Sequence, residues 1–205
     1  MAGPEPGRVR PARVARIHRT LWGIARGGSW FGGVLILGSA FVVTADVLMR
    51  KFWGVTLGGA DLIAGYALAI ASAWGFGFAF LGRAHIRIDS FYVRMPAWLR
   101  IAVDFAGIGL MLAFFGLVTW YAIGVVAQSA ARGSRSISAL QIPVAVPQAI
   151  WVAGLLFFLL AMLLTLLRAI PLATTGRHAE LQRLIGSKSA DEEIVEERVA
   201  SGLGP

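Results

Sequence analysis

Four long apolar runs, separated by short charged segments, constrain the fold of this chain most strongly. They cover residues 27–49, 60–81, 101–127 and 146–170. At about 1.5 Å of rise per helical residue, each run can cross the roughly 30 Å hydrocarbon core of a bilayer. Backbone groups in lipid must be hydrogen-bonded internally, and the period-two alternation of a membrane β-barrel is absent from the runs. The sequence therefore predicts an all-α integral membrane protein with four transmembrane helices.

The composition argues against a soluble domain and excludes several kinds of site. Of the 205 residues, 57% are hydrophobic and only 15% are charged, whereas soluble domains average about 45–50% and about 25%. The chain has no cysteine, which excludes disulfides, thiolate-bound zinc and iron–sulfur clusters. Most of the net charge of +8 flanks the apolar runs. Contact with anionic membrane lipid explains that placement better than nucleic-acid binding, so no nucleic-acid partner is predicted.

The runs divide the chain into a basic tail (1–26), a four-helix membrane domain (27–170) and a second tail (171–205) that is expected to be partly disordered. The arginine-rich start resembles that of a signal peptide. However, the first apolar run is about twice as long as a signal's apolar region. It also ends in Asp46, Arg50 and Lys51 rather than at a small-residue cleavage site. We therefore interpret it as an uncleaved first span.

Two segments outside the spans are predicted to lie in the membrane interface. Apolar side chains recur at helical spacing opposite arginines at Val14, Ile17, Leu21 and Ile24. This pattern is typical of an interfacial amphipathic helix before span one. An extension of span one is the alternative. In the loop 82–100, aromatic and basic residues alternate, which predicts a second interfacial segment between spans two and three.

The distribution of lysine and arginine predicts the orientation. Fifteen basic residues lie in the two tails and the middle loop, whereas four lie in the two other loops. Because basic residues are retained on the cytoplasmic side, both termini are predicted to be cytoplasmic. The basic residues of the other loops are Arg50, Lys51, Arg132 and Arg135.

Charged groups inside a membrane span are candidates for function because their insertion is costly, and here all of them lie near span ends. Asp46 has Arg50 four residues later, and Asp104 has Arg100 four residues earlier. Asp61 opens span two, where a carboxylate suits the positive end of the helix dipole. Structural pairing and capping is the favoured interpretation. A direct role in ion or substrate passage is the alternative.

No cofactor, metal site or catalytic site is predicted. The histidines, His18, His85 and His178, lie outside the spans, whereas a haem anchor usually needs a mid-span axial ligand. Phosphate-binding glycine loops, nucleophile elbows and zinc-ligand spacings are also absent from the sequence. The chain is therefore not expected to be an enzyme.

Span two carries a stripe of small residues, which we name the span-two stripe. Its members recur at every fourth position: Asp61, Gly65, Ala69, Ala73 and Gly77. In lipid, small residues permit close backbone contact between helices. The stripe therefore predicts a helix–helix contact, either within this chain or with a partner subunit. Span one carries a weaker form of it at Gly28, Gly32 and Gly33.

The chain resembles the small membrane subunit (DctQ type) of tripartite ATP-independent periplasmic (TRAP) transporters. The resemblance covers most of residues 27–170 and rests on four spans with both ends inside, on DVLMRKF closing span one, and on an IP…P arrangement before span four. Its most specific part is WGFGFAFLGRAHIRIDSF, which contains Arg83, His85, Arg87 and Asp89. These four are candidate anchoring and pairing residues at the interface. One departure is that Asp61 is the only acid where the family often has paired glutamates.

The resemblance implies partners and a location. A large membrane subunit (DctM type) would hold the substrate and sodium sites, and a periplasmic binding protein (DctP type) would deliver an organic acid. The small subunit would brace the static scaffold in the bacterial inner membrane. Two alternatives from other classes are a membrane anchor of an electron-transfer complex and a small self-assembling four-span exporter. The absence of mid-span histidines argues against the first, and the position of Asp46 near a span end argues against the second.

Overall fold

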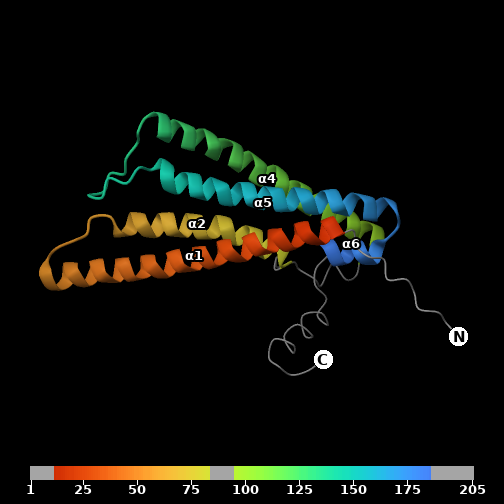
Figure 1. Ribbon diagram of the computed structural model, residues 1–205, viewed down its shortest axis with the longest axis horizontal. Coiled ribbons are helices and arrows are strands. Elements are labelled where there is room, and N and C mark those ends of the chain that lie inside the picture. The colour runs from red at the N-terminus through yellow and green to blue at the C-terminus, as the bar shows by residue number, and fades with distance from the viewer. Residues whose placement is uncertain (1–11, 84–94, 186–205) are drawn as a thin grey trace, which may run out of the picture.

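A computed structural model describes residues 12–83 and 95–185, which form five helices and no strand (Figure 1). They are α1 (Ala12–Trp53), α2 (Ala60–Leu81), α4 (Ala97–Ala131), α5 (Ala145–Thr174) and α6 (His178–Ile185). Four of them, all except α6, are long and apolar enough to cross a membrane. The predicted all-α membrane fold is therefore confirmed.

The helix boundaries differ most from the sequence prediction in α1. Helix α2 coincides with the predicted span 60–81, and α4 and α5 extend beyond their predicted spans at both ends. Helix α1 has 42 residues, or about 63 Å at 1.5 Å per residue. The segment before residue 27 is helical as predicted, but it continues into span one without a break. Of the two interpretations drawn from the sequence, the extension of span one therefore describes it.

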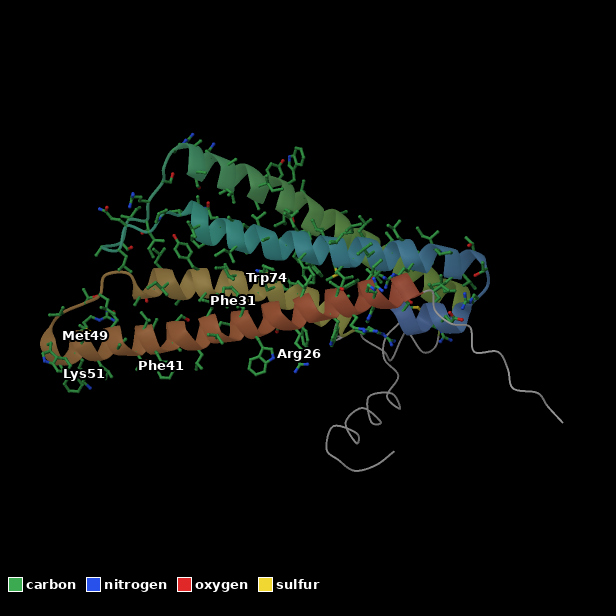
Figure 2. All side chains as sticks on the ribbon, viewed as in Figure 1. Arg26, Phe31, Phe41, Met49, Lys51 and Trp74 are labelled. Carbon is green, nitrogen blue, oxygen red and sulfur yellow. The ribbon has the colours of Figure 1, made fainter. Side chains whose placement is uncertain are left out.

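The four long helices form a row in the order α1, α2, α5, α4 (Figure 1). Helix α2 packs against α1 on one side and α5 on the other, and α4 packs against α5. We name the end at which α1 and α4 begin the tail end, and the opposite end the loop end. Because the row is one helix thick over much of its length, many apolar side chains of α1 and α4 face outward, among them Phe41 (Figure 2).

At the loop end, two connections meet. The link between α1 and α2 covers residues 54–59, and the link between α4 and α5 covers residues 132–144. The amide of Ala139 donates a hydrogen bond to the carbonyl oxygen of Gly58 at 3.1 Å. Gly58 has a φ of +67°, which a side chain would disfavour. The two helical hairpins are thus joined at this end through their backbones.

At the tail end, α6 turns back and packs against α4 and α5. Leu181 and Ile185 are buried in a cluster with Ile108 of α4 and Ala169 of α5. The C-terminal tail, which was expected to be partly disordered, is therefore ordered as far as Ile185, and its remainder lies outside the described residues. The predicted interfacial segment in the loop 82–100 also lies mostly outside them.

Candidate functional site

Trp74 of α2 joins three helices (Figure 2). Its indole Nε1 donates a hydrogen bond to the carbonyl oxygen of Ile150 on α5 at 3.2 Å, and its ring stacks on Phe157 of α5 with centroids 5.9 Å apart. On the opposite side, a Cβ atom added to Gly28 of α1 would collide with the same ring. A Cβ added to Gly154 of α5 would lie 2.9 Å from its Cδ1. The indole is therefore held between glycines of two neighbouring helices.

Backbone contact also joins α1 and α2 further along. A Cβ at Gly32 would lie 2.8 Å from the Cα of Ala71. Together with Gly28, this residue gives α1 the small–x–x–x–small spacing that lets membrane helices approach closely. Gly33 differs, since a Cβ there would meet nothing within 4 Å. Two of the three glycines flagged in span one therefore pack within the chain.

A second packed group is aromatic and joins α2, α4 and α5. Phe158 of α5 is fully buried at its centre. Its ring centroid lies 4.9 Å from that of Phe115, 5.7 Å from that of Phe76 and 5.9 Å from that of Phe80. These tilted and edge-on geometries are favourable for aromatic pairs. We name this group together with the Trp74 contacts the aromatic junction.

The span-two stripe does not form one contact face. Ala73 and Gly77 are buried, and a Cβ at Gly77 would lie 2.7 Å from Cε1 of Phe157. Asp61, Gly65 and Ala69 are exposed. The reason is geometric: a period of four residues turns about 40° further than a full helical turn at each step, so the stripe winds around α2. One half packs inside the chain, and the other half faces outward.

The exposed half of the stripe belongs to a wider surface that we name the open face of α2. Its members are Asp61, Gly65, Leu68, Ala69 and Ser72, all exposed. A Cβ placed at Gly65 would meet nothing within 4 Å, and Leu68 is 61% exposed. At 100° per residue these positions lie on the side of α2 away from its contacts with α1. The surface is small, mostly apolar and carries one carboxylate.

Asp46 organises the turn between α1 and α2. Its Oδ1 accepts hydrogen bonds from the Thr56 hydroxyl at 2.9 Å and from the Leu57 amide at 2.6 Å. The predicted partner Arg50 approaches Oδ2 at 3.8 Å, but its side chain is 63% exposed. An exposed pair at that distance contributes little. The carboxylate is therefore held mainly by the turn that follows α1, a role that the sequence did not indicate.

The other charged residues singled out in the sequence lie at different places in the row and have different contacts. Asp61 lies exposed in the first turn of α2. Arg100, the residue expected to pair with Asp104, donates from Nε to the carbonyl oxygen of Met95 at 2.8 Å. Asp104 is only 2% exposed, and it takes part in an interaction with another residue.

The residues around the middle loop are described only in part. Arg83 follows α2 with a φ of +55°, and it also takes part in further interactions. His85, Arg87 and Asp89 lie outside the described residues. The anchoring and pairing role expected for these residues at the membrane interface therefore stays a prediction.

Several hydroxyls within the spans bond to the helices that carry them, whereas the Oε1 of Gln148 in α5 is buried without a hydrogen-bond partner among the described residues. The hydroxyl of Thr119 donates to the carbonyl oxygen of Phe115 at 2.7 Å, and that of Thr165 donates to Ala161 at 2.8 Å. Among residues 12–83 and 95–185, no group of three or more histidine, aspartate or glutamate side chains could hold a metal ion.

These features define a class: a multi-pass helical membrane protein whose identifiable sites are contacts between helices. The family model of the tripartite ATP-independent periplasmic transporters, DctQ component, matches residues 39–172. That range covers more than half of the chain, so the chain belongs to the DctQ family. No curated protein and no solved structure matches it.

Family membership makes this chain a small permease subunit of a TRAP transporter and a multi-pass inner-membrane protein. Its partners are in general a large membrane subunit and a binding protein. The family is one of transporter components rather than of enzymes. The predicted resemblance is therefore confirmed over the last third of α1, over α2 and α4, and over nearly all of α5.

Three contact residues, Trp74, Phe158 and Gly154, were not among those predicted from the sequence. A signal existed for the first of these. Tryptophan usually marks the membrane interface, and its N–H needs a partner when it is buried. Trp74 lies well inside span two, which indicates a partner on another helix. No comparable signal distinguishes Phe158 from the many phenylalanines that face lipid.

Proposed function

We propose that this subunit braces the large membrane subunit (DctM type) of its transporter and carries no part of the substrate path. The complex would take up an organic acid, delivered by a periplasmic binding protein (DctP type), with sodium as the coupling ion. The observation that carries the proposal is that four hydroxyls inside the spans are bonded to their own helices, namely those of Ser39, Thr44, Thr119 and Thr165. A transport path is lined by polar groups that face a cavity, which these do not provide.

Rigidity is the second requirement of a brace, and the aromatic junction supports it. Trp74 is fixed by one hydrogen bond, one stacked ring and glycines on two helices. A sliding motion of α1 or α5 along α2 would drive a backbone into the indole. The row α1–α2–α5 would therefore move as one body while the large subunit changes conformation.

The open face of α2 is the surface that we assign to the large subunit. Gly65 and Ala69 would let a helix of the partner approach closely, which is how helices associate without a hydrophobic driving force. Asp61, exposed at the loop end, would meet a basic or hydrogen-bond-donating group of the partner. The span-two stripe was predicted to contact either this chain or a partner subunit. Under this assignment its buried half contacts this chain and its exposed half contacts the partner.

The orientation follows the positive-inside rule, with both termini cytoplasmic and residues 132–144 periplasmic. Because the chain has no cysteine, single cysteines can be labelled without background. Ser134→Cys should react with an impermeant thiol reagent added outside intact cells, and Thr175→Cys should react only after the membrane is opened. Outside labelling of Thr175→Cys alone would reverse the orientation.

Reconstitution in liposomes tests the brace. The small subunit alone, with the binding protein and a sodium gradient, should give no uptake of any of a panel of labelled dicarboxylates, keto acids and sugar acids. With its large subunit and binding protein, uptake of one of them should appear, and omission of the small subunit should abolish it.

Three results would contradict the proposal. Uptake by the small subunit alone would favour a transporter of the self-assembling kind. A variant such as Asp61→Asn that binds the large subunit fully and yet blocks uptake would move this carboxylate into the transport mechanism. A haem spectrum of the purified chain would instead favour the electron-transfer anchor.

A further inference from the structure

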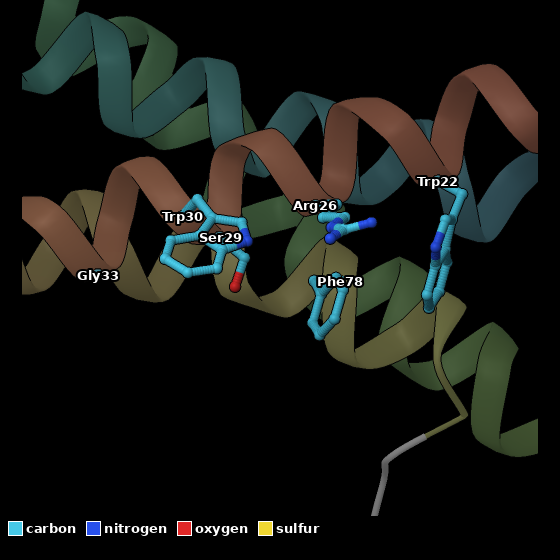
Figure 3. A pocket seen from close by; sticks show the side chains of 6 residues that line it. All are labelled: Trp22, Arg26, Ser29, Trp30, Gly33 and Phe78. Atoms are coloured by element: carbon cyan, nitrogen blue, oxygen red, sulfur yellow. The ribbon is translucent and has the colours of Figure 1, made fainter. Parts of the chain in front are cut away.

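A groove of about 310 Å³ opens on the side of the row near the tail end (Figure 3). It is lined by Trp22, Arg26, Ser29, Trp30 and Gly33 of α1 and by Phe78 of α2. All of the α1 members precede residues 39–172, the range matched by the family. The α1 side of the groove therefore lies outside the range on which the family assignment rests.

Arg26 occupies the centre of the groove. It lies one helical turn from Trp22 and one from Trp30, and in Figure 3 its guanidinium extends from between the two indoles. Arg26 is exposed, and it forms no hydrogen bond or ion pair with the described part of the chain. A guanidinium has five donors and matches carboxylate or phosphate oxygens in pairs. In this setting it needs an anion from outside the chain.

The depth of the groove restricts what that anion can be. The Trp22 ring reaches the end of α2, where its Cη2 would lie 3.7 Å from a Cβ placed at Gly82. Trp22 also contacts Phe78 in a tilted arrangement, with ring centroids 5.3 Å apart. Tryptophans with one apolar and one wet edge lie at headgroup level. With Trp22 at that level, Arg26 would lie about one turn, roughly 5 Å, closer to the bilayer centre, within reach of lipid phosphates and glycerol backbones.

The floor of the groove continues toward the bilayer centre as an apolar track. Gly33 leaves open space, since a Cβ there would meet nothing within 4 Å. One turn further along the same side, Leu37 is 61% exposed. A ligand that places an anionic group on Arg26 would therefore lay a hydrocarbon chain over Gly33 and Leu37.

We propose that this groove binds an anionic phospholipid of the leaflet at the tail end. The phosphodiester would pair with the Arg26 guanidinium, Ser29 could donate to a phosphate or ester oxygen, and one acyl chain would follow the apolar track. A free phosphate would gain only the arginine contact, whereas a lipid gains the apolar contact as well. The two flanking indoles would hold the glycerol region between them.

Fluorescence quenching by brominated lipid tests the proposal on the full chain. The protein is placed in phosphatidylcholine vesicles that contain increasing fractions of dibrominated phosphatidylglycerol or, in parallel, dibrominated phosphatidylcholine. Because the chain has seven tryptophans, the groove signal is the part of the quenching lost in Trp22→Phe/Trp30→Phe. Half-quenching of that part should need about three- to tenfold less phosphatidylglycerol than phosphatidylcholine, as expected for one cation near an anionic headgroup.

Matched variants separate the headgroup from the acyl contact. Arg26→Gln should remove the preference for phosphatidylglycerol, and Arg26→Lys should keep part of it. Gly33→Leu should fill the track and weaken quenching by both lipids without disturbing α1–α2 packing, because its Cβ direction is open. Unchanged elution on gel filtration and unchanged helicity would show that each variant is folded.

Three outcomes would overturn the proposal. The first is equal quenching by both lipids in the unmodified chain, and the second is an unaltered preference in Arg26→Gln. The third is displacement of the brominated lipid by millimolar glycerol 3-phosphate, which would define a headgroup-only site. A fourth outcome concerns the complex with the large subunit. If the large subunit abolishes the groove quenching, and if Arg26→Gln no longer binds the large subunit, the groove would be a protein contact and not a lipid site.

Discussion

The two halves of the span-two stripe have the same kind of residue and opposite surroundings. Ala73 and Gly77 are buried against α5, where added atoms would meet Phe157. Gly65 and Ala69, two turns nearer the loop end, are exposed. The comparison teaches that a run of small residues indicates close contact but not its partner. A four-residue period winds around the helix, so one stripe can serve two neighbours.

The halves should also differ in what they contribute to stability. In lipid, burial of apolar surface does not drive helices together, so the buried half stabilises the fold through dispersion contacts at short range. The exposed half exchanges lipid contacts for protein contacts only when a partner arrives. Substitutions at the two halves should therefore change different measurements, unfolding in one case and assembly in the other.

The largest effect is expected where the buried half meets α5. In Gly154→Leu, the new Cβ would lie 3.0 Å from the Cβ of Ala73 and 3.1 Å from its carbonyl carbon, besides the contact with Trp74. Because backbone lies in the way, the helices must separate. We expect a loss of about 3 kcal/mol in the free energy of unfolding, the upper part of the range for overpacked cores. Thermal unfolding in detergent, followed by circular dichroism, measures it.

Ala153→Leu is the matched control. Ala153 is the preceding residue of α5 and is exposed, so the same added side chain should cost little there. Equal losses at the two positions would show that the contact with Ala73 has no special status.

The sequence was sufficient to predict where the spans lie along the chain but not how the helices are arranged. The apolar runs located α2 without error because its ends are marked by Gly58–Gly59 and Gly82. Helix α1 was predicted too short, since the alternation of arginine with Ile17 and Leu21 fits an interfacial helix and a long projecting helix equally well. Helix α6 was missed, although Leu181, Leu184 and Ile185 have the i, i+3, i+4 spacing of an amphipathic helix.

The candidate contacts were harder to predict because they depend on the order of the row. In one sequence, Gly28, which packs on Trp74, cannot be distinguished from Gly33, which lies open. The same holds for Asp46: a carboxylate four residues before Arg50 indicates an ion pair, whereas its main partners lie beyond the end of the helix. Turn geometry, and not helical spacing, decides that contact.

An intermediate effect is expected at this loop-end turn, which lies beside the open half of the stripe. Asp46→Asn removes the charge from the acceptor of the Thr56 and Leu57 hydrogen bonds. Hydrogen bonds to charged groups contribute about 1.5–3 kcal/mol, and asparagine keeps a weaker acceptor, so we expect a loss of about 1–2 kcal/mol. Hydrogen exchange of the Leu57 amide should accelerate about tenfold or more. Arg50→Gln should change it much less, because that pair is long and exposed.

The smallest effect on folding, and the one that decides the comparison, is expected at the open half. In Gly65→Leu the new Cβ meets nothing within 4 Å, and leucine favours a helix by somewhat less than 1 kcal/mol over glycine. Thermal unfolding of the isolated subunit should therefore be unchanged or should occur at a slightly higher temperature. If the open face of α2 contacts the large subunit, the same change should prevent close approach of the partner's helix and lower the fraction of large subunit that co-purifies. Gly38→Leu on α1 is the matched control, since it is equally open and should leave co-purification unaltered. Full co-purification with Gly65→Leu would mean that the large subunit binds elsewhere on the row. The two halves of the stripe would then differ only in that one faces protein and the other faces lipid.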